Sequence, residues 1–296
     1  MNFSDTFPGF FPDNGIPWRA WDAHVLSITI PGFILCIFFL VLGIRFRNNK
    51  KAANITVFCL GLLLLSTELY KQICRNMMRG MQFGEYAFEI FPWQICSIPM
   101  FISLLMPLFR RRGRDTLFMF MGVYSMMGGF FALFANQQGL FGWGDVGIYV
   151  QTILWHVVLL WLGFFSLGYL SIGKYGYKRN MRVCLYSYGL LVVFSGIAQF
   201  INWLIPNVYG INSAQAMNTN MWYISMYYPS PVFVLKDIWA SGPNGWIWAY
   251  LLYMVVLGLG NIIFINIYYF IYHGYSKFRF RRKLRTHSML INDAKY

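Results

Sequence analysis

Charged residues are scarce in this chain, and acidic residues are the scarcest of all. The sequence contains only 10 Asp and Glu among 296 residues, and 11% of its residues are charged. Soluble domains carry about 25% charged residues. Hydrophobic residues make up 58% of the chain. The composition therefore predicts a membrane protein and excludes an ordinary water-soluble domain.

Several sequence signatures are missing as well. The five cysteines form no CxxC pair and the four histidines no HxxxH pair, so we expect neither a disulfide framework nor a metal site. The phosphate-binding motif GxxxxGK[ST] is absent, and the sequence predicts no cofactor. The net charge of +14 comes from short basic clusters between apolar runs, which argues against a nucleic-acid partner.

Seven apolar runs are long enough to cross a bilayer. A hydrocarbon core of about 30 Å needs roughly 20 apolar residues in a helix, and runs without strict alternation favour helices over barrel strands. The predicted spans are residues 24–46, 52–73, 88–109, 116–136, 149–173, 183–205 and 245–272. The sequence therefore predicts an all-α membrane protein, a bundle of seven transmembrane helices.

The basic residues predict the orientation of this bundle. Of the 24 Lys and Arg, 19 follow the first, third, fifth and seventh spans, and 5 lie on the opposite side. The positive-inside rule then places the N-terminus outside and the C-terminus inside. We expect an outer N-terminal segment at 1–23, a membrane domain at 24–273 and a basic cytoplasmic tail at 274–296. The expected location is the cell membrane, a bacterial plasma membrane, with membrane lipids as partners.

Residues 206–244 form the longest predicted connection, on the outer side between the last two spans. The segment is rich in Trp and Tyr, which favour the membrane interface. Three of its prolines, Pro229, Pro231 and Pro243, prevent one continuous helix. We therefore expect a lid-like loop over the outer mouth of the bundle.

Polar residues gather in the outer third of the predicted bundle. At about 1.5 Å per residue, Cys96 lies roughly 12 Å and His156 roughly 10 Å below the outer ends of their spans. Ionisable residues within a span are costly and indicate a functional site by default. The other candidates in or near this layer are Glu68, Gln94, Asn136, Gln137, Gln199, Asn202, Asn220 and Tyr223.

The stretch FPWQICSIP holds a thiol between two prolines. Pro99 removes a helix hydrogen bond and predicts a kink beside Cys96. On a helical wheel Gln94 lies roughly opposite Cys96, so the two side chains face different ways unless the prolines distort the turn. A reactive thiolate needs a neighbouring cation, and His156 is the one candidate at that depth. A lone cysteine within a span is most often just a small apolar residue.

Four stretches resemble one known family. FPWQICSIP resembles the LPLHLC signature of the YwaF-type integral membrane proteins, and MGGFFALFANQQ resembles their glycine-rich fourth span. His156 falls where that family has a histidine, and NTNMWYI…YPSP…WASGPNGWIW resembles its NYMYL…KP…GPWPWY stretch. The family is similar to an animal transmembrane acyltransferase that remodels ether phospholipids through an acyl-cysteine. The resemblance implies that Cys96 is the acyl carrier.

The chain departs from this signature at one position. The family histidine two residues before the cysteine is Gln94 here, and an amide cannot act as a general base. Catalysis by this chain would then depend on His156 as the base.

Three classes of function stay open. The first is a cysteine-dependent acyltransferase or lipid hydrolase acting on an acyl chain or phospholipid, with Cys96 as nucleophile, His156 as base and Glu68 or Asn202 as orienting group. The second is a transporter or ligand-binding protein that uses the same cavity without catalysis. The third is an accessory protein whose polar residues join helices, which Asn261 fits best.

Overall fold

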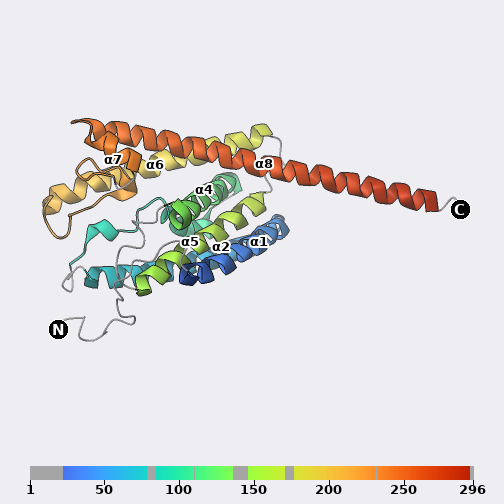
Figure 1. The fold of residues 1–296 in the computed structure, drawn as a ribbon, viewed down its shortest axis with the longest axis horizontal. Coiled ribbons are helices and arrows are strands. Elements are labelled where there is room, and N and C mark those ends of the chain that lie inside the picture. The colour runs from blue at the N-terminus through green and yellow to red at the C-terminus, as the bar shows by residue number, and fades with distance from the viewer. Residues whose placement is uncertain are drawn as a thin grey trace.

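The computed structural model describes residues 23–78, 85–109, 111–135, 146–170, 177–230 and 233–293 (Figure 1). Within these ranges the chain is helical with irregular connections, and it contains no strand. The α-helices are α1 (Ala23–Phe46), α2 (Lys50–Met78), α3 (Ile98–Leu105), α4 (Arg111–Phe130), α5 (Val146–Leu170), α6 (Tyr177–Tyr209), α7 (Phe233–Ala240) and α8 (Gly245–Asp293).

Six of these helices are long and apolar enough to cross a membrane, namely α1, α2, α4, α5, α6 and α8. The predicted span at 88–109 is broken instead of continuous. It consists of a 3₁₀ turn at Phe88–Ile90, a non-helical stretch at 91–97, the eight-residue helix α3 and a second 3₁₀ turn at Met106–Leu108. The structure therefore shows an all-helical, multi-pass membrane bundle with six long helices, and the third predicted span is a short, interrupted helix.

Proline explains where α3 begins. Pro99 lies in the first turn of α3, where its missing N–H costs no helical hydrogen bond, and Ser97 is the N-cap residue. The backbone amide of Ser97 donates to the carbonyl of Gln94 at 2.8 Å, which closes a turn just before the helix. The predicted kink beside Cys96 is thus the start of a helix, and Cys96 lies in the preceding turn.

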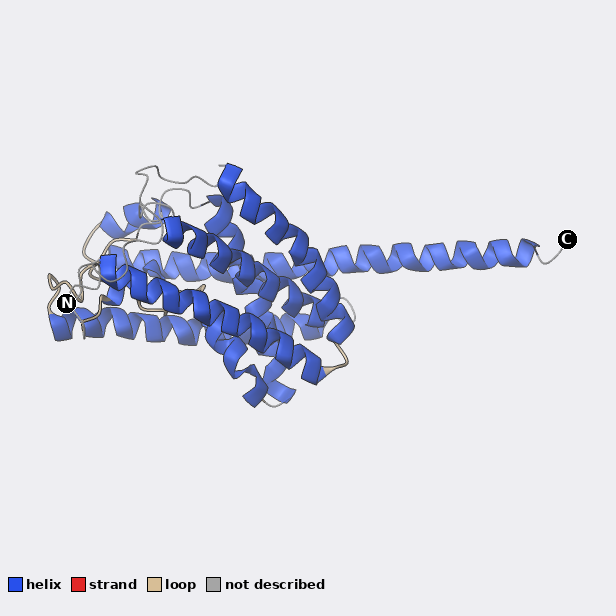
Figure 2. Cartoon of the chain, turned by 90° about the horizontal axis from the view of Figure 1, so that it is seen from below, coloured by secondary structure: helices blue, strands red, loops and turns tan. Residues whose placement is uncertain are grey.

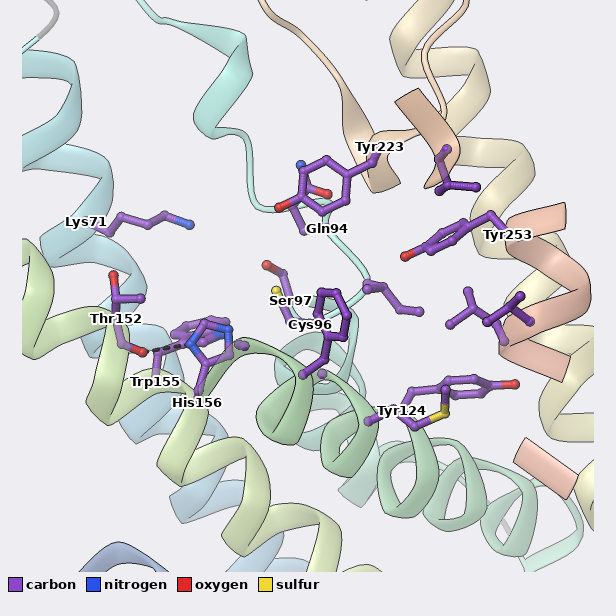
Figure 3. A pocket seen from close by; sticks show the side chains of 18 of the residues that line it. Lys71, Gln94, Cys96, Ser97, Tyr124, Thr152, Trp155, His156, Tyr223 and Tyr253 are labelled. Carbon is purple, nitrogen blue, oxygen red and sulfur yellow. Dashed lines mark hydrogen bonds between the residues drawn. The ribbon is translucent and has the colours of Figure 1, made fainter. Parts of the chain in front are cut away.

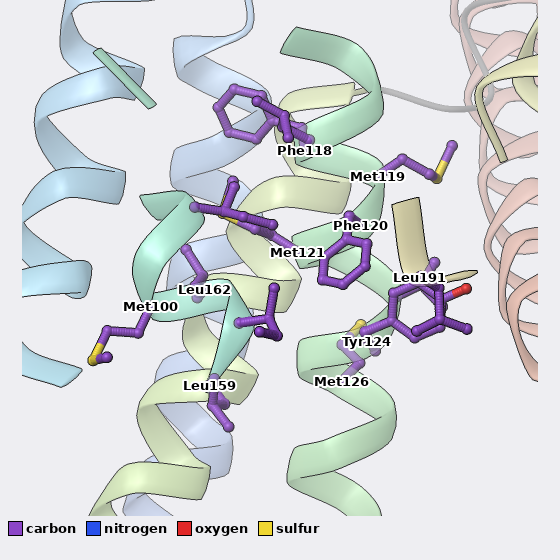
Figure 4. Close-up of a cluster of buried hydrophobic side chains, with 14 of the residues drawn as sticks. Met100, Phe118, Met119, Phe120, Met121, Tyr124, Met126, Leu159, Leu162 and Leu191 are labelled. Atoms are coloured by element: carbon purple, nitrogen blue, oxygen red, sulfur yellow. The ribbon is translucent and has the colours of Figure 1, made fainter. Parts of the chain in front are cut away.

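The helices α4 and α5 form the centre of the bundle. Inside the protein lie 72% and 83% of their most apolar windows, against 22–33% for the other four long helices. Figure 4 shows Phe118, Met121 and Tyr124 of α4 beside Leu159 and Leu162 of α5. The outer helices therefore direct most of their apolar side chains away from the protein, as contact with lipid requires.

Glycines allow α1 to lie directly against α5. A Cβ atom at Gly43 would lie 2.2 Å from the carbonyl oxygen of Phe165, and one at Gly168 would lie 2.3 Å from that of Leu40. Small residues that let two backbones approach this closely are typical of membrane helix interfaces. This seam holds α5, the helix that carries His156, in a fixed position.

The connection predicted at 206–244 begins with the last turn of α6, which continues through Pro206. Residues 210–230 are irregular around a 3₁₀ turn at Met221–Tyr223, and α7 follows. Met221 and Trp222 are fully buried. Trp222 and Tyr223 both have φ of 62°, which bulky residues rarely adopt. The loop is therefore a packed element in a strained conformation, which neighbouring contacts must stabilise.

The two ends of the chain differ from their predicted boundaries. The helix α8 continues to Asp293 and extends beyond the bundle, as Figures 1 and 2 show. Most of the predicted tail is thus a helical extension of roughly 30 Å, from the rise of an α-helix. The predicted outer segment at 1–23 lies outside the described residues, apart from Ala23.

Candidate functional site

A cavity of about 490 Å³ lies among α2, α4, α5, α7, α8 and two irregular stretches, residues 91–97 and 210–230 (Figure 3). Most of its lining is apolar. Its main polar residues are Lys71, Arg75, Gln94, Cys96, His156 and Tyr223. The cavity therefore combines a nucleophile, an imidazole and two cations with a surface suited to an apolar ligand.

The structure brings Cys96 and His156 to this one cavity from separate elements. Cys96 comes from the turn before α3 and His156 from the middle of α5, and both side chains point into the cavity in Figure 3. Gly128 of α4 lies behind the cysteine, because a Cβ atom there would be 3.6 Å from the Cβ atom of Cys96. His156 is buried.

One hydrogen bond determines the tautomer of His156. Its Nδ1 atom lies 2.7 Å from the backbone carbonyl oxygen of Thr152, one turn earlier in α5. A carbonyl oxygen can only accept, so Nδ1 must carry the proton and Nε2 of the neutral ring is left as an acceptor. The group that orients the imidazole is therefore a backbone carbonyl, and Nε2 can take a proton from a nucleophile.

The sequence suggested Glu68 as a group that orients His156, but the contacts of Glu68 in the structure are with other residues. Its buried carboxylate contacts Lys71 Nζ at 2.5 Å and accepts a hydrogen bond from Gln72. Gln72 also donates to the carbonyl of Ile90 at 2.7 Å and accepts from the hydroxyl of Tyr86. Glu68 does not line the cavity. Gln72, and not Glu68 itself, joins α2 to the segment that leads to Cys96.

Lys71 is a cavity residue that the sequence analysis treated only as an outer-side charge. Its Nζ atom lies 5.8 Å from the ring centroid of Trp155, a cation–π distance, besides its contact with Glu68. Arg75, one turn later on α2, lines the same cavity. The spacing of Glu68, Lys71 and Arg75 puts three ionisable residues on one face of a span, and this pattern could have identified Lys71 from the sequence.

Two of the predicted site residues hold the backbone of the loop at 210–230. Gln94 donates through Nε2 to the carbonyl of Asn220 at 3.2 Å, and its Oε1 accepts from the amide of Trp222 at 2.7 Å. Asn202 donates to the carbonyl of Met221 at 3.0 Å and accepts from the amide of the same residue at 2.6 Å. Each of these two side-chain amides therefore donates one hydrogen bond to the backbone of the strained turn and accepts one from it.

Two further predicted residues act in the same way. Gln199 donates to the carbonyl of Ile224 at 2.8 Å. Asn220 donates to the carbonyls of Tyr228 and Pro229 and accepts from the amide of Ser225 at 2.9 Å. We call the set of Gln94, Gln199, Asn202 and Asn220 the amide clamp. Its bonds offset the cost of the left-handed conformations at 222 and 223.

Gln94 belongs to the clamp and also lines the cavity. The helical wheel placed it opposite Cys96, yet both residues face the same cavity because residues 91–97 are not helical. The predicted Asn136 and Gln137 lie outside the described residues.

Tyr223 presents its ring to the cavity from the loop. Burial is the main cause that raises the pKa of Tyr223 to about 12, with Cys96 raising it further and the charge of Arg75 opposing. The phenol therefore stays protonated at neutral pH and can donate a hydrogen bond to a bound ligand.

The apolar end of the cavity opens at the exposed surface of the bundle. Phe131, Val234 and Val256 line it and are also 51%, 54% and 52% exposed. Phe131 begins a π-helical stretch, Phe131–Ala135, which widens α4 at this point. The opening lies between the end of α4 and the α7–α8 pair, on surface that is apolar enough to face lipid.

Among the described residues, no group of three or more His, Cys, Asp or Glu is placed to hold a metal ion. The site thus offers acid–base and nucleophilic groups. The reactive and charged groups that line it include Cys96, His156, Lys71 and Arg75.

Comparison with known proteins places the chain in a family. The model of the TMEM164 family matches residues 20–265, which include every cavity residue described above. The search of curated proteins gave no match, and neither did the search of solved structures. The family match covers most of the chain, and six helices are able to cross a membrane. The chain is therefore a multi-pass membrane protein that belongs to the TMEM164 family.

Proposed function

We propose that this protein transfers or hydrolyses an acyl group of a membrane lipid through a thioester on Cys96. The observation that carries this proposal is that Cys96 and His156 line one cavity that opens onto apolar outer surface, with Nδ1 of His156 bonded to the carbonyl of Thr152. The resemblance to the YwaF-type proteins, and through them to the animal ether-phospholipid acyltransferase, supports the same chemistry. A thiol and an imidazole in one site meet the general requirement for covalent catalysis.

The reaction has two balanced steps. In the first, Nε2 of His156 takes the thiol proton while the sulfur of Cys96 attacks the ester carbonyl of the lipid. The ester C–O bond then breaks, and the imidazolium returns the proton to the leaving alkoxide. In the second, the hydroxyl of an acceptor lipid, or water, attacks the thioester with His156 again as base, and the thiol is regenerated.

The shape of the cavity fits a lipid that enters from the side. Its exposed apolar end, at Phe131, Val234 and Val256, would admit an acyl chain from the bilayer without exposing that chain to water. The loop closes the opposite region, because the fully buried Trp222 is bound to Gln94 beside the nucleophile. An ester group of the lipid could then reach Cys96 while its chain remains in the apolar part.

We also propose seven crossings, with the N-terminus outside and the C-terminus inside a bacterial plasma membrane. The interrupted segment at 88–109 would supply the third crossing, and the 19 to 5 distribution of basic residues supports the orientation. Cysteines introduced at the exposed positions Gly113 and Ser241 should react with impermeant reagents from opposite sides of the membrane. Labelling of both from one side would contradict the topology.

A binding or transport role without catalysis is the second candidate. Two observations favour it: an interrupted helix lines the cavity, as in many transporters, and Gln94 replaces the signature histidine. In this case the cavity would hold a lipid or a small molecule, and Cys96 would only contact it.

Labelling with a phospholipid that carries an alkyne-tagged acyl chain separates the two roles. The purified wild-type protein should acquire a label that hydroxylamine removes, because hydroxylamine cleaves thioesters. Cys96→Ser should acquire no such label, since an alcohol is a far weaker nucleophile without a strong base. Cys59→Ser is the matched control, because Cys59 is exposed on α2 and should not affect labelling. A hydroxylamine-sensitive label that persists in Cys96→Ser would reject Cys96 as the carrier and favour the binding role.

A further inference from the structure

The proposed attack places negative charge in a largely apolar cavity. Charge appears first on the sulfur of Cys96 and then on the oxygen of the attacked carbonyl, and both need stabilisation in a poorly solvated site. To act as the base His156 must be neutral before the attack, so it brings no positive charge to the site beforehand. From the sequence, the imidazole of His156 was the one candidate cation near Cys96, whereas the structure places a second cation at the cavity.

That cation is the ammonium group of Lys71. In Figure 3 its side chain extends from α2 into the cavity, toward the side where Cys96 and Tyr223 lie. Glu68 contacts Nζ at 2.5 Å and does not line the cavity, so it holds the ammonium from the protein side. An ammonium has three N–H donors, which leaves donors for a group in the cavity.

Two contacts fix the position of the Lys71 ammonium, and one of them is with the residue next to His156. Its ammonium lies 5.8 Å from the ring centroid of Trp155, the residue directly before His156. Glu68 is fixed in turn by Gln72, which binds the backbone at Ile90. A lysine normally samples many rotamers, so these contacts pre-organise its charge at small entropic cost during the reaction.

The cavity surface around Cys96 carries positive and neutral ionisable groups, whereas the Glu68 carboxylate behind Lys71 opposes a negative charge on the thiol. No carboxylate lines the cavity among the described residues. The ionisable side chains that line the cavity together with Cys96 are Lys71 and Arg75 of α2, His156 of α5, Tyr124 of α4, Tyr223 of the loop and Tyr253 of α8. An anion that forms at the sulfur therefore finds a cation and several hydroxyl donors, and no competing negative group on the cavity surface.

We propose that Lys71 is a further catalytic residue, whose ammonium stabilises the Cys96 thiolate and then the oxyanion of the attacked carbonyl. The oxyanion part of this inference rests on the proposed acyl transfer. Lys71 forms no covalent bond and keeps its proton throughout. Removal of a donor of this kind typically lowers catalysis by about 10²–10³-fold.

The first test measures the thiol without any lipid. The rate at which iodoacetamide alkylates Cys96 is followed against pH, with the modified peptide quantified by mass spectrometry. Lys71→Met keeps the length of the side chain and removes its charge, so the midpoint of the profile should rise by about one pH unit. Lys71→Arg should stay near the wild type. Lys236→Met, at an exposed lysine of α7, is the matched control and should leave the midpoint unchanged.

A change at Glu68 should act in the opposite direction. Glu68→Gln removes the carboxylate that shares the ammonium of Lys71, so the midpoint should fall. This variant keeps the inference testable if Lys71→Met does not fold. A purely structural role for Lys71 would leave the midpoint unchanged in every folded variant, and this result would overturn the proposal.

The second test measures acyl transfer with the tagged phospholipid. Lys71→Met should slow the formation of the thioester about 100-fold, and Lys71→Arg should recover most of the rate. If the wild type forms no thioester but Lys71→Met still shifts the midpoint, the acyl-transfer function fails while the effect of Lys71 on the thiol stands. An unchanged midpoint together with an unchanged transfer rate overturns the role of Lys71.

Discussion

Two groups of polar residues lie next to each other at the cavity and use their side chains differently. The amide clamp, formed by Gln94, Gln199, Asn202 and Asn220, directs its donors and acceptors to the backbone of the loop. Cys96, His156 and Lys71 direct reactive or charged groups into the cavity instead. The depth predicted from the sequence does not separate these groups, whereas their hydrogen-bond partners do.

The chemistry of the loop explains why amides form the clamp. Residues 218–225 contain no regular helix or strand beyond one 3₁₀ turn, so several buried N–H and C=O groups need partners from side chains. An Asn or Gln side chain both donates and accepts without adding charge, which suits a pair such as the amide and carbonyl of Met221. A lysine could only donate to such a pair.

The largest expected effect concerns the cavity. In His156→Ala the base is lost, so acyl transfer to Cys96 should fall by about 10²–10⁴-fold. The melting temperature should change little, because the Nδ1 bond of His156 joins two residues of the same helix and bridges no separate elements. Single-turnover labelling and thermal unfolding in detergent measure the two quantities. A transfer rate near that of the wild type would show that another group acts as the base.

The next effect concerns the clamp and should appear in stability. Asn202→Leu removes both bonds to Met221 and leaves a buried amide and carbonyl without these partners, which should lower the free energy of unfolding by about 3 kcal/mol. Chemical denaturation measures this value. Asn266→Leu is the control, because the Asn266 amide donates only to a carbonyl of its own helix, that of Ile262. Equal losses in the two variants would contradict a special role for the clamp.

The smallest effect concerns Gln94, which belongs to both regions. Gln94→Leu should cost about 1–2 kcal/mol of stability, because two bonds to the loop are lost at a partly buried position. The midpoint of Cys96 alkylation should stay within a few tenths of a pH unit, since an amide carries no charge. A larger shift would show that Gln94 affects the ionisation of the thiol. The histidine at this position of the YwaF-type signature would have such an effect.

The sequence by itself determined the membrane class and the long helices, and it predicted a common depth for Cys96 and His156. Hydropathy and helical rise are properties of each segment alone, so the apolar runs located α1, α2, α4, α5, α6 and α8. The aromatic composition of residues 206–244 predicted a lid-like loop over the outer mouth of the bundle, which stays a prediction. The resemblance of the stretch around Cys96 to the YwaF-type signature implied a role for its thiol.

Only the tertiary structure decided which polar residues meet. Pro99 could kink a helix or begin one, and the contacts of residues 91–97 with the loop select the second outcome. This change places Gln94 beside Cys96, against the helical wheel. The partners of Lys71 come from α2 and from α5, and those of Asn202 come from the loop. Such pairings join segments that are distant in the chain, and a periodic pattern within one segment carries no information about them.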